Sequence, residues 1–350
     1  MKNILRWVTA GLVFAICHSA STLAENPSHS DSSLQWTMST PFPEPRTDYA
    51  AGVVNNRLVI AGGTYWEGSK GNWIQKHVSS STHAFDPISH TWAKLSDLPT
   101  PLSDAASAVI ANKLYVVGGY TGAHINRDIY VLESGSKGNI WKRFGEFPMD
   151  RLFAHSVSVG TRLYVLGGIT EFESIDAKGT CCTSRTATDS VVMFDTAHPE
   201  RGWKPLSALP GPKRVFFSAV TDGESIWVFG GSYQSNPAEA SVSFNQVFRY
   251  HVGENRWEAV KALPDHSPET DSPSPVVVKD KIILITRAKN VWQLDTKSQS
   301  YTNLSPLPES AGVDEFVWLN DEIIGAGGEN QIEGPRRRSE WTFIGRFLTQ

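Results

Sequence analysis

Short apolar runs recur along the chain, separated by polar segments that are rich in glycine, asparagine, aspartate and proline. Runs such as LVIA, LYVV and IWVF are four residues long, which suits β-strands and is too short for helices. The polar segments between them carry the residues that tight turns need. The pattern therefore predicts an all-β chain of many short strands.

The predicted strands are organised as six repeats. An aromatic residue is followed seven positions later by proline in every unit: Trp36 and Pro43, Trp92 and Pro99, Trp141 and Pro148, Trp203 and Pro210, Trp257 and Pro264, Tyr301 and Pro308. Five units also have an apolar strand ending in a glycine pair: Gly62–Gly63, Gly118–Gly119, Gly167–Gly168, Gly230–Gly231 and Gly327–Gly328. The fifth unit has Thr286 and Arg287 instead. One small sheet cannot bury both of its faces, so the units are expected to stack around a ring.

These residues resemble the kelch repeat, and the resemblance covers almost the whole chain. It implies an all-β fold, a six-bladed kelch β-propeller with four strands in each blade. The chain starts with the tryptophan strand around Trp36 and ends with WTFIGRF, a third-strand pattern without a tryptophan strand of its own. We therefore expect the N- and C-terminal strands to pair and close the last blade. The repeat tryptophans are expected to fill the wedges between blades.

The first residues have the features of a secretory signal. Lys2 and Arg6 precede an apolar stretch, and Thr22-Leu23-Ala24 offers the small residues of a cleavage site. We assign residues 1–24 to a signal peptide, 25–33 to a disordered lead-in and 34–350 to the propeller. The expected protein is exported, periplasmic or extracellular, and has no membrane span, because the apolar stretch is shorter than the roughly 20 residues that a span needs.

Charge and cysteine content narrow the function. The chain has 32 basic and 36 acidic residues, so it lacks the basic footprint of a nucleic-acid binder. Cys17 lies in the signal, and the adjacent Cys181 and Cys182 have no zinc-ligand spacing. This pair is interpreted either as two loop thiols or as an oxidised vicinal pair that stiffens a loop.

The connections on the two faces of the predicted ring differ. The hairpins between first and second strands are short and uniform, as in VVNNRL and WLNDEI. The connections that follow the glycine pairs are longer and individual, at 64–80, 120–126, 169–189, 232–243 and 329–340. We call the face with the longer connections the top face and expect binding there.

Three arginines open first strands at this top face: Arg46, Arg151 and Arg214. We expect them to converge at the mouth of the central channel as an anion site, because a guanidinium binds carboxylates in a bidentate manner. The alternative is that each holds a loop by pairing with a local acid, such as Asp48 or Asp150.

The segment GGENQIEGPRRRSE resembles a motif of the periplasmic kelch mutarotases that act on N-acetylneuraminate, the N-acetylneuraminate epimerases. Residues of this chain match the motif in order, namely Glu329, Pro335, Arg338, Ser339 and Glu340. The resemblance implies a sugar mutarotase in which Glu329 transfers the proton and Arg338 is its partner. Arg336 or Arg337 could equally be the matching arginine.

Mutarotation by ring opening needs a base at the anomeric hydroxyl, a proton donor at the ring oxygen and an anchor for the sugar carboxylate. Glu329 suits the base. His155, Tyr65 or a water suits the donor, and Arg46, Arg151 or Arg214 the anchor.

This interpretation needs no cofactor and no metal. The expected partner is a small acidic sugar, and the long top loops also leave room for a protein partner. The alternative is a non-catalytic carbohydrate- or protein-binding propeller, in which Glu329 forms only a salt bridge at the rim.

Overall fold

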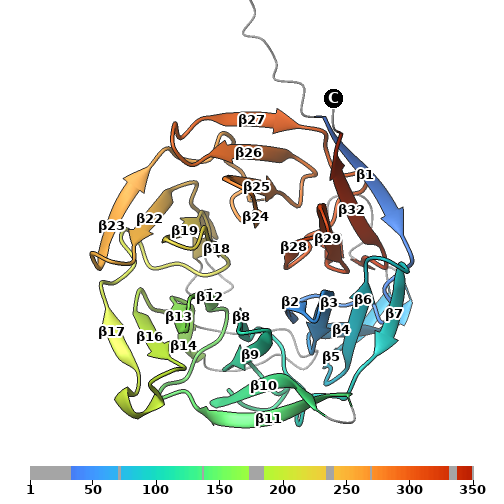
Figure 1. The fold of residues 1–350 in the computed structure, drawn as a ribbon, viewed down its shortest axis with the longest axis horizontal. Coiled ribbons are helices and arrows are strands. Elements are labelled where there is room, and N and C mark those ends of the chain that lie inside the picture. The colour runs from blue at the N-terminus through green and yellow to red at the C-terminus, as the bar shows by residue number, and fades with distance from the viewer. Residues whose placement is uncertain are drawn as a thin grey trace, which may run out of the picture. The chain divides into compact units, whose positions relative to one another are not determined.

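A computed structural model describes residues 33–69, 72–135, 138–172, 185–233, 240–268, 270–330 and 337–348. This part of the chain forms six antiparallel four-stranded sheets, or blades, arranged around a central channel (Figure 1). The first strand of each blade lines the channel and the fourth lies at the outer rim. The expected six-bladed β-propeller is confirmed.

The blades contain the following strands. Blade 1 has β2 (Ala50–Val54), β3 (Arg57–Ala61), β6 (Thr82–Asp86) and β7 (Thr91–Lys94); blade 2 has β8 (Ala106–Ile110), β9 (Lys113–Val117), β10 (Asp128–Gly135) and β11 (Gly138–Glu146). Blade 3 has β12 (His155–Val159), β13 (Arg162–Leu166), β16 (Val191–Asp195) and β17 (Lys204–Leu206), with a 3-10 turn, Pro199–Arg201, before β17. Blade 4 has β18 (Ser218–Thr221), β19 (Ser225–Phe229), β22 (Val247–His251) and β23 (Arg256–Val260); blade 5 has β24 (Ser274–Val278), β25 (Lys281–Ile285), β26 (Val291–Asp295) and β27 (Tyr301–Leu304). Blade 6 has β28 (Phe316–Leu319), β29 (Glu322–Ala326), β32 (Thr342–Phe347) and β1 (Leu34–Ser39).

The ring closes in blade 6, where β1 pairs antiparallel with β32 from Leu34 opposite Phe347 to Ser39 opposite Thr342. Trp36 lies against Gly345, where an added Cβ would come within 2.8 Å of the indole ring. The pairing of the two chain ends leaves this blade without an open strand edge at that point. The predicted closure is therefore confirmed.

The short hairpins between first and second strands make tight two-residue turns. Asn55 and Asn56 both have positive φ angles, 52° and 55°, and Asn320 and Asp321 repeat this with 52° and 60°. Two successive left-handed residues are the signature of a type I′ turn, which matches the twist of the flanking strands. Asn and Asp tolerate that conformation better than most residues.

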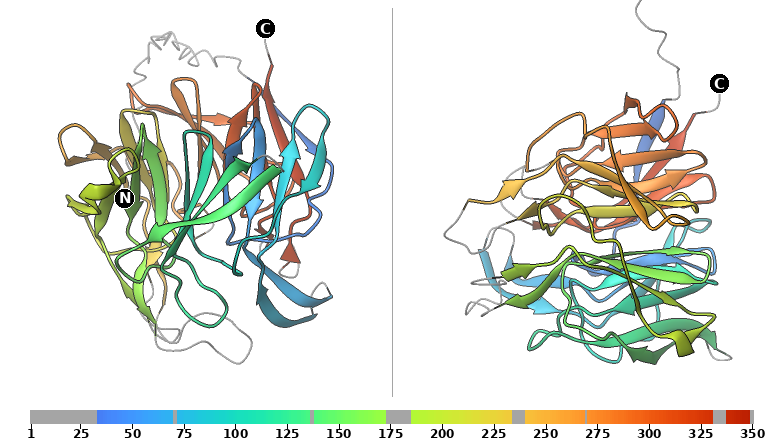
Figure 2. Two further views of the ribbon diagram at one scale, coloured as in Figure 1. Left: turned by 60° about the horizontal axis from the view of Figure 1, so that its bottom comes forward. Right: turned by 90° about the vertical axis from the view of Figure 1, so that its left-hand side faces the viewer.

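The top face carries additional two-stranded hairpins after the second strand of four blades (Figure 2). They are β4 (Thr64–Ser69) with β5 (Asn72–Val78), β14 (Ile169–Phe172) with β15 (Arg185–Ala187), β20 (Ser232–Tyr233) with β21 (Val242–Ser243), and β30 (Glu329–Asn330) with β31 (Arg337–Arg338). The glycine pairs allow the chain to enter these hairpins. A Cβ on Gly63, whose φ is 92°, would lie 2.7 Å from the Thr47 carbonyl oxygen, so only glycine fits there.

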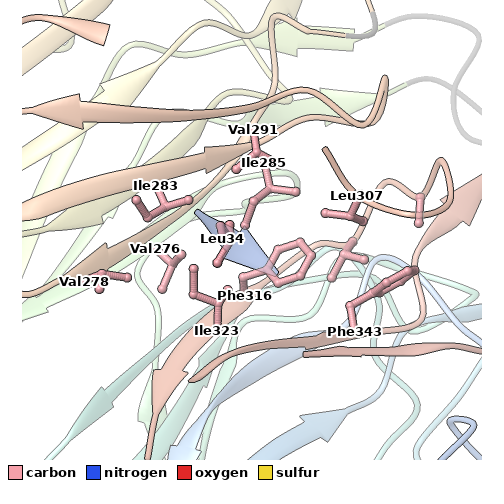
Figure 3. Close-up of a cluster of buried hydrophobic side chains, with 12 residues drawn as sticks. Leu34, Val276, Val278, Ile283, Ile285, Val291, Leu307, Phe316, Ile323 and Phe343 are labelled. Carbon is pink, nitrogen blue, oxygen red and sulfur yellow. The ribbon is translucent and has the colours of Figure 1, made fainter. Parts of the chain in front are cut away.

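The core is divided among the interfaces between blades. Figure 3 shows one cluster, formed by β24, β25 and β26 of blade 5 together with β28, β29, β32 and β1 of blade 6. Phe316 and Phe343 are both buried in it. Each buried side chain of this size contributes on the order of 1.5–3 kcal/mol, so neighbouring blades stabilise each other.

The repeat tryptophans also join neighbouring blades. The Trp92 indole N–H donates to Thr342 Oγ1 (3.1 Å), which links blade 1 to blade 6, and the Trp141 indole donates to Thr82 Oγ1 (3.1 Å), which links blade 2 to blade 1. The predicted placement of these rings between blades is confirmed at both positions.

Two expectations fall outside the described residues: the signal peptide with most of the lead-in, and the cysteine pair at 181–182. Within the described ranges, no helix has the length and apolar character to cross a membrane.

Candidate functional site

The described residues line at least two hollows at the top face. One is a groove of about 850 Å³ beside the β4–β5 hairpin, lined by Tyr65, Trp66, Arg338 and Glu340 together with Glu44, Pro45 and Ser79–Ser81. The other is a cavity of about 160 Å³ at the mouth of the central channel. The groove falls within the roughly 300–1,000 Å³ typical of small-molecule sites.

Glu329 and Arg338 meet directly across the β30–β31 hairpin, where they are opposite partners in the strand register. Their side chains form a close ion pair, and the two residues are only 4% and 9% exposed. Arg338 also donates to Thr64 Oγ1 at 3.0 Å and lines the groove. The pair thus links a buried carboxylate to the groove through one guanidinium.

The structure distinguishes between two of the three candidate arginines. Arg337 points to Glu309, with which it forms its own ion pair, and Arg336 lies outside the described residues. Arg338 is therefore the partner of Glu329 among the arginines described.

Arg46, Arg151 and Arg214 do not converge at the channel, and the structure corrects that expectation. They are 0%, 3% and 0% exposed, and each guanidinium points away from the axis toward the loop before the third strand of its own blade. Their hydrogen-bond partners are Ser79 Oγ (2.8 Å) and the Ser81 carbonyl (3.1 Å) for Arg46, Ser190 Oγ (2.8 Å) and the Gly167 carbonyl (3.2 Å) for Arg151, and Gln246 Oε1 (2.6 Å) and the Gly230 carbonyl (3.0 Å) for Arg214.

The physical reason is the repeat itself, because the same position in three blades has similar surroundings, with carbonyl and side-chain acceptors from the loop before the third strand. Burial lowers the pKa of each of these arginines to about 10, so all three stay protonated at neutral pH. A buried cation needs several acceptors, and the loop carbonyls and hydroxyls supply them. Asp150 pairs instead with Arg127 at 2.7 Å and Asp48 with Lys76 at 3.1 Å. Arg46 does have a local acid, because the Glu44 carboxylate lies 3.4 Å from its guanidinium, so the alternative of a local ion pair holds for that arginine.

Tyr65 and His155 lie in different hollows. Tyr65 is 43% exposed in the groove and stacks on His77 with ring centroids 5.2 Å apart. His155 begins β12 and lines the channel mouth, 5.3 Å from the Phe217 ring. Burial lowers the pKa of His155 to about 4, so its imidazole is neutral at neutral pH. Of these two candidate donors, Tyr65 is the one that lines the groove with Arg338.

The channel mouth contains carboxyl groups that were not among the predicted site residues. Asp48, Asp104, Asp314 and Glu315 all line its cavity. Asp48 and Asp104 precede the first strands of blades 1 and 2 with similar positive φ angles, 61° and 55°, and the Asp104 N–H donates to the Asp48 carbonyl at 2.9 Å. Phe153 continues the series in blade 3, with its N–H 3.1 Å from the Asp104 carbonyl.

The acids at the mouth have strongly shifted pKa values. Burial and the nearby charge of Asp48 raise the pKa of Asp104 and of Asp314 to about 7, and burial together with Asp314 raises that of Glu315 to about 8. Burial also disfavours ionisation of Asp48. The charges of Lys76 and Arg338 and the Thr64 hydroxyl outweigh that effect and hold the pKa of Asp48 below its usual range.

The sequence contained a signal for these residues. Asp48 and Asp104 stand at the same register of their repeats, in RTD and LSD. The expectation placed the arginine of RTD at the channel, whereas the residue two positions later lies there.

Comparisons with known proteins agree with this fold. The Kelch motif model matches residues 45–99, 101–143 and 213–264, which lie in blades 1, 2 and 4. Together with the six four-stranded blades, these matches establish the chain as a β-propeller built from kelch repeats.

Individual relatives match in part. The N-acetylneuraminate epimerase of Vibrio vulnificus is 39% identical over 77 residues, which is 22% of this chain and 20% of that protein. The enzyme of the same name from Vibrio cholerae is 30% identical over 70 residues, 20% of this chain and 18% of that protein. The kelch-like protein terF of Aspergillus terreus is 23% identical over 83% of this chain and 51% of its own length. The chain therefore spans only a part of each of these relatives.

Proposed function

We propose that this kelch propeller is an exported sugar mutarotase that interconverts the anomers of N-acetylneuraminate or a related acidic sugar in the groove of the top face. The observation that carries the proposal is the buried Glu329–Arg338 pair, whose arginine lines a groove of suitable size. The local similarity to two N-acetylneuraminate epimerases supports the same substrate class.

Arg338 and Tyr65 in the groove, together with the Glu329 carboxylate that is paired with Arg338 behind it, offer the functions that ring opening requires. Arg338 presents a guanidinium to the groove, where it would bind the sugar carboxylate. When Arg338 binds the sugar carboxylate, its ion pair with Glu329 weakens. Glu329 then accepts the proton of the anomeric hydroxyl. Tyr65 lies in the same groove as a donor to the ring oxygen and as a surface for the sugar ring. Ring closure on the opposite face returns both protons and yields the other anomer.

The other four predicted site residues do not line the groove. His155 lines a different cavity from Tyr65, and Arg46, Arg151 and Arg214 are held inside their blades. We therefore assign the carboxylate anchor to Arg338 and the donor to Tyr65.

The test is proton NMR on freshly released α-N-acetylneuraminate, followed to anomer equilibrium with and without the purified protein. We expect the protein to accelerate equilibration and Glu329→Gln to reduce the acceleration by about 100-fold or more, since a general base contributes that much. Glu329→Asp keeps the charge beside Arg338 but moves the carboxylate, and it should lose most activity as well.

Stability must be measured alongside, because Glu329→Gln leaves the Arg338 charge buried without its carboxylate. That loss costs about 3–5 kcal/mol in typical buried pairs, whereas Glu329→Asp should cost less. Glu254→Gln makes the same chemical change at a residue whose side chain is 61% exposed and serves as the control. No acceleration by the wild type, or full activity per folded molecule in both Glu329 variants, would contradict the proposal.

A non-catalytic binding propeller is the second candidate. The Glu329–Arg338 pair is buried and its charges balance. A purely structural ion pair would have the same two properties, and this favours the second candidate. In that case the wild type would bind the sugar in the groove without changing the rate of equilibration.

A further inference from the structure

The cavity at the channel mouth is divided into two chemically different halves. Blades 6, 1 and 2, which are consecutive around the ring, contribute the carboxyl groups of Asp48, Asp104, Asp314 and Glu315. Blades 3 and 4 contribute aromatic rings, Phe153 and Phe216, whose centroids are 4.8 Å apart. Phe216 is 42% exposed. A hollow with acids on one side and rings on the other favours a ligand that is itself charged at one end and apolar at the other.

The positive charges near this cavity are already engaged. Lys76 lies 3.1 Å from Asp48, and Arg338 is paired with Glu329. The hydrogen bonds of Asp104 and Asp314 come from neutral groups, namely Ser103 Oγ (2.7 Å) to Asp104, and Thr47 Oγ1 (3.0 Å) and the Tyr49 N–H (3.5 Å) to Asp314. The acidic half therefore has capacity for one further positive charge.

A second observation points to a ligand independently of the acids. Ser156 lines the same cavity and is only 8% exposed, yet its hydroxyl oxygen makes no hydrogen bond to any residue in the described part of the chain. Buried hydroxyls in native proteins nearly always have a partner. A bound molecule in the cavity would supply it.

The arrangement favours an organic cation over a metal ion. Among the described residues, no three His, Cys, Asp or Glu side chains are grouped closely enough to hold a metal. Ca²⁺ needs six to eight oxygen ligands around one point, whereas these carboxyls are spread along one wall. The opposite wall is aromatic, and such rings attract ammonium groups and pack against apolar bodies.

We propose that the channel mouth binds a small organic ammonium ion, with its charge beside Asp104, Asp314 and Glu315 and its apolar body against Phe153 and Phe216. Ser156 hydrogen-bonds to the bound molecule. This site goes beyond the proposed mutarotase function, because it lies in a different cavity from Tyr65 and takes a ligand of opposite charge.

Binding at this site depends on pH. Asp104 and Asp314, with pKa values near 7, and Glu315, near 8, carry part of their protons at neutral pH. The other charged or titratable groups facing them are Asp48, Lys76, Arg338, Arg287, Tyr49 and His155. Because an ammonium ion favours the ionised carboxylates, its binding releases protons and strengthens as the pH rises through 7.

The experiment is isothermal titration of the full chain with benzylamine and with benzyl alcohol, a matched pair that differs in charge. At about pH 8.5 we expect the amine to bind at least about 10-fold more tightly than the alcohol, and to weaken about 10-fold at about pH 6. The heat should vary with the ionisation enthalpy of the buffer, which reports the released proton.

Asp104→Asn and Asp314→Asn should each weaken the amine about 10-fold, whereas the exposed Asp280→Asn, whose side chain is 62% exposed, should have no effect. Asn tolerates the positive φ of residue 104 as well as Asp does, and thermal unfolding confirms that each variant is folded. Equal affinity for amine and alcohol, or unchanged affinity in both variants, would overturn the proposal. Binding of Ca²⁺ to the wild type that is lost in the same variants would overturn it as well. None of these results depends on mutarotation, which is measured separately with N-acetylneuraminate.

Discussion

Buried arginines at one position of the repeat act as internal supports of the blades. Arg214 illustrates the arrangement: it donates to the Gly230 carbonyl and to Gln246 and lies over the Phe244 and Phe248 rings, 4.7 Å and 5.3 Å from their centroids. Hydrogen bonds to a charged group contribute about 1.5–3 kcal/mol each. The side chain thereby fixes the entry into the first strand relative to the loop before the third.

Replacement of Arg214 by Ala is therefore expected to destabilise the protein without altering ligand recognition. We expect a loss of about 2–4 kcal/mol in the free energy of unfolding, measured by urea denaturation, because several buried acceptors lose their donor. Arg256→Ala removes an arginine whose side chain is 54% exposed, and should change stability by less than about 0.5 kcal/mol. An Arg214→Ala variant that is stable but binds the sugar more weakly would contradict this role and support the anion site expected from the sequence.

Residue positions were predictable where the repeat fixes the backbone, and side-chain directions were not. Arg46 and Asp48 lie two positions apart in a segment that enters the first strand, and Asp48 has a φ of 61°. One left-handed residue turns the chain there, so the arginine points into the blade and the aspartate toward the channel. Sequence spacing alone does not reveal such a turn.

At the scale of elements, the strands and the ring closure followed from the sequence because each repeat provides several agreeing signals. The glycine pairs, the turn residues of the short hairpins and the repeat tryptophans all lie where the register placed them. The top connections were predicted only as variable loops. Their short hairpins depend on pairing after the glycine pair, as between Glu329 and Arg338.

The same element explains how much of the candidate site was predictable. The resemblance at GGENQIEGPRRRSE pointed to Glu329 with one of three arginines, and the two-residue strands of the hairpin bring Arg338 opposite it. The pairing register of the hairpin, rather than the order of residues, determines which arginine lies opposite Glu329. The acids of the channel mouth were missed because sequence spacing does not show which side chain of each strand entry faces the channel.

At the scale of the whole molecule, the acids around the channel make stability depend on pH. Asp104, Asp314 and Glu315 have raised pKa values in the folded state, so the folded protein binds more protons than the unfolded chain. Their contribution to stability is therefore full below about pH 4, where both states are protonated, and falls as the pH rises from there through 7 and 8. The lowered pKa values of His155 and Asp48 act in more acidic ranges.

Thermal unfolding between about pH 6.5 and about pH 8.5 should thus show a loss of stability on the order of 1–3 kcal/mol. In this interval His155 is neutral in the folded state and titrates only at the lower end in the unfolded chain, where its effect opposes the loss by less than about 0.5 kcal/mol. The double variant Asp104→Asn with Asp314→Asn should show a markedly smaller change, because amides do not titrate. A dependence as steep in the double variant as in the wild type would contradict this assignment.

The proposed function depends on binding of the sugar in the groove beside Arg338. The most direct measurement is a crystal structure of the protein with N-acetylneuraminate bound. We expect the sugar carboxylate on Arg338, the ring beside Tyr65 and the anomeric hydroxyl within reach of Glu329. A sugar seated instead over Phe153 and Phe216 at the channel mouth would contradict it.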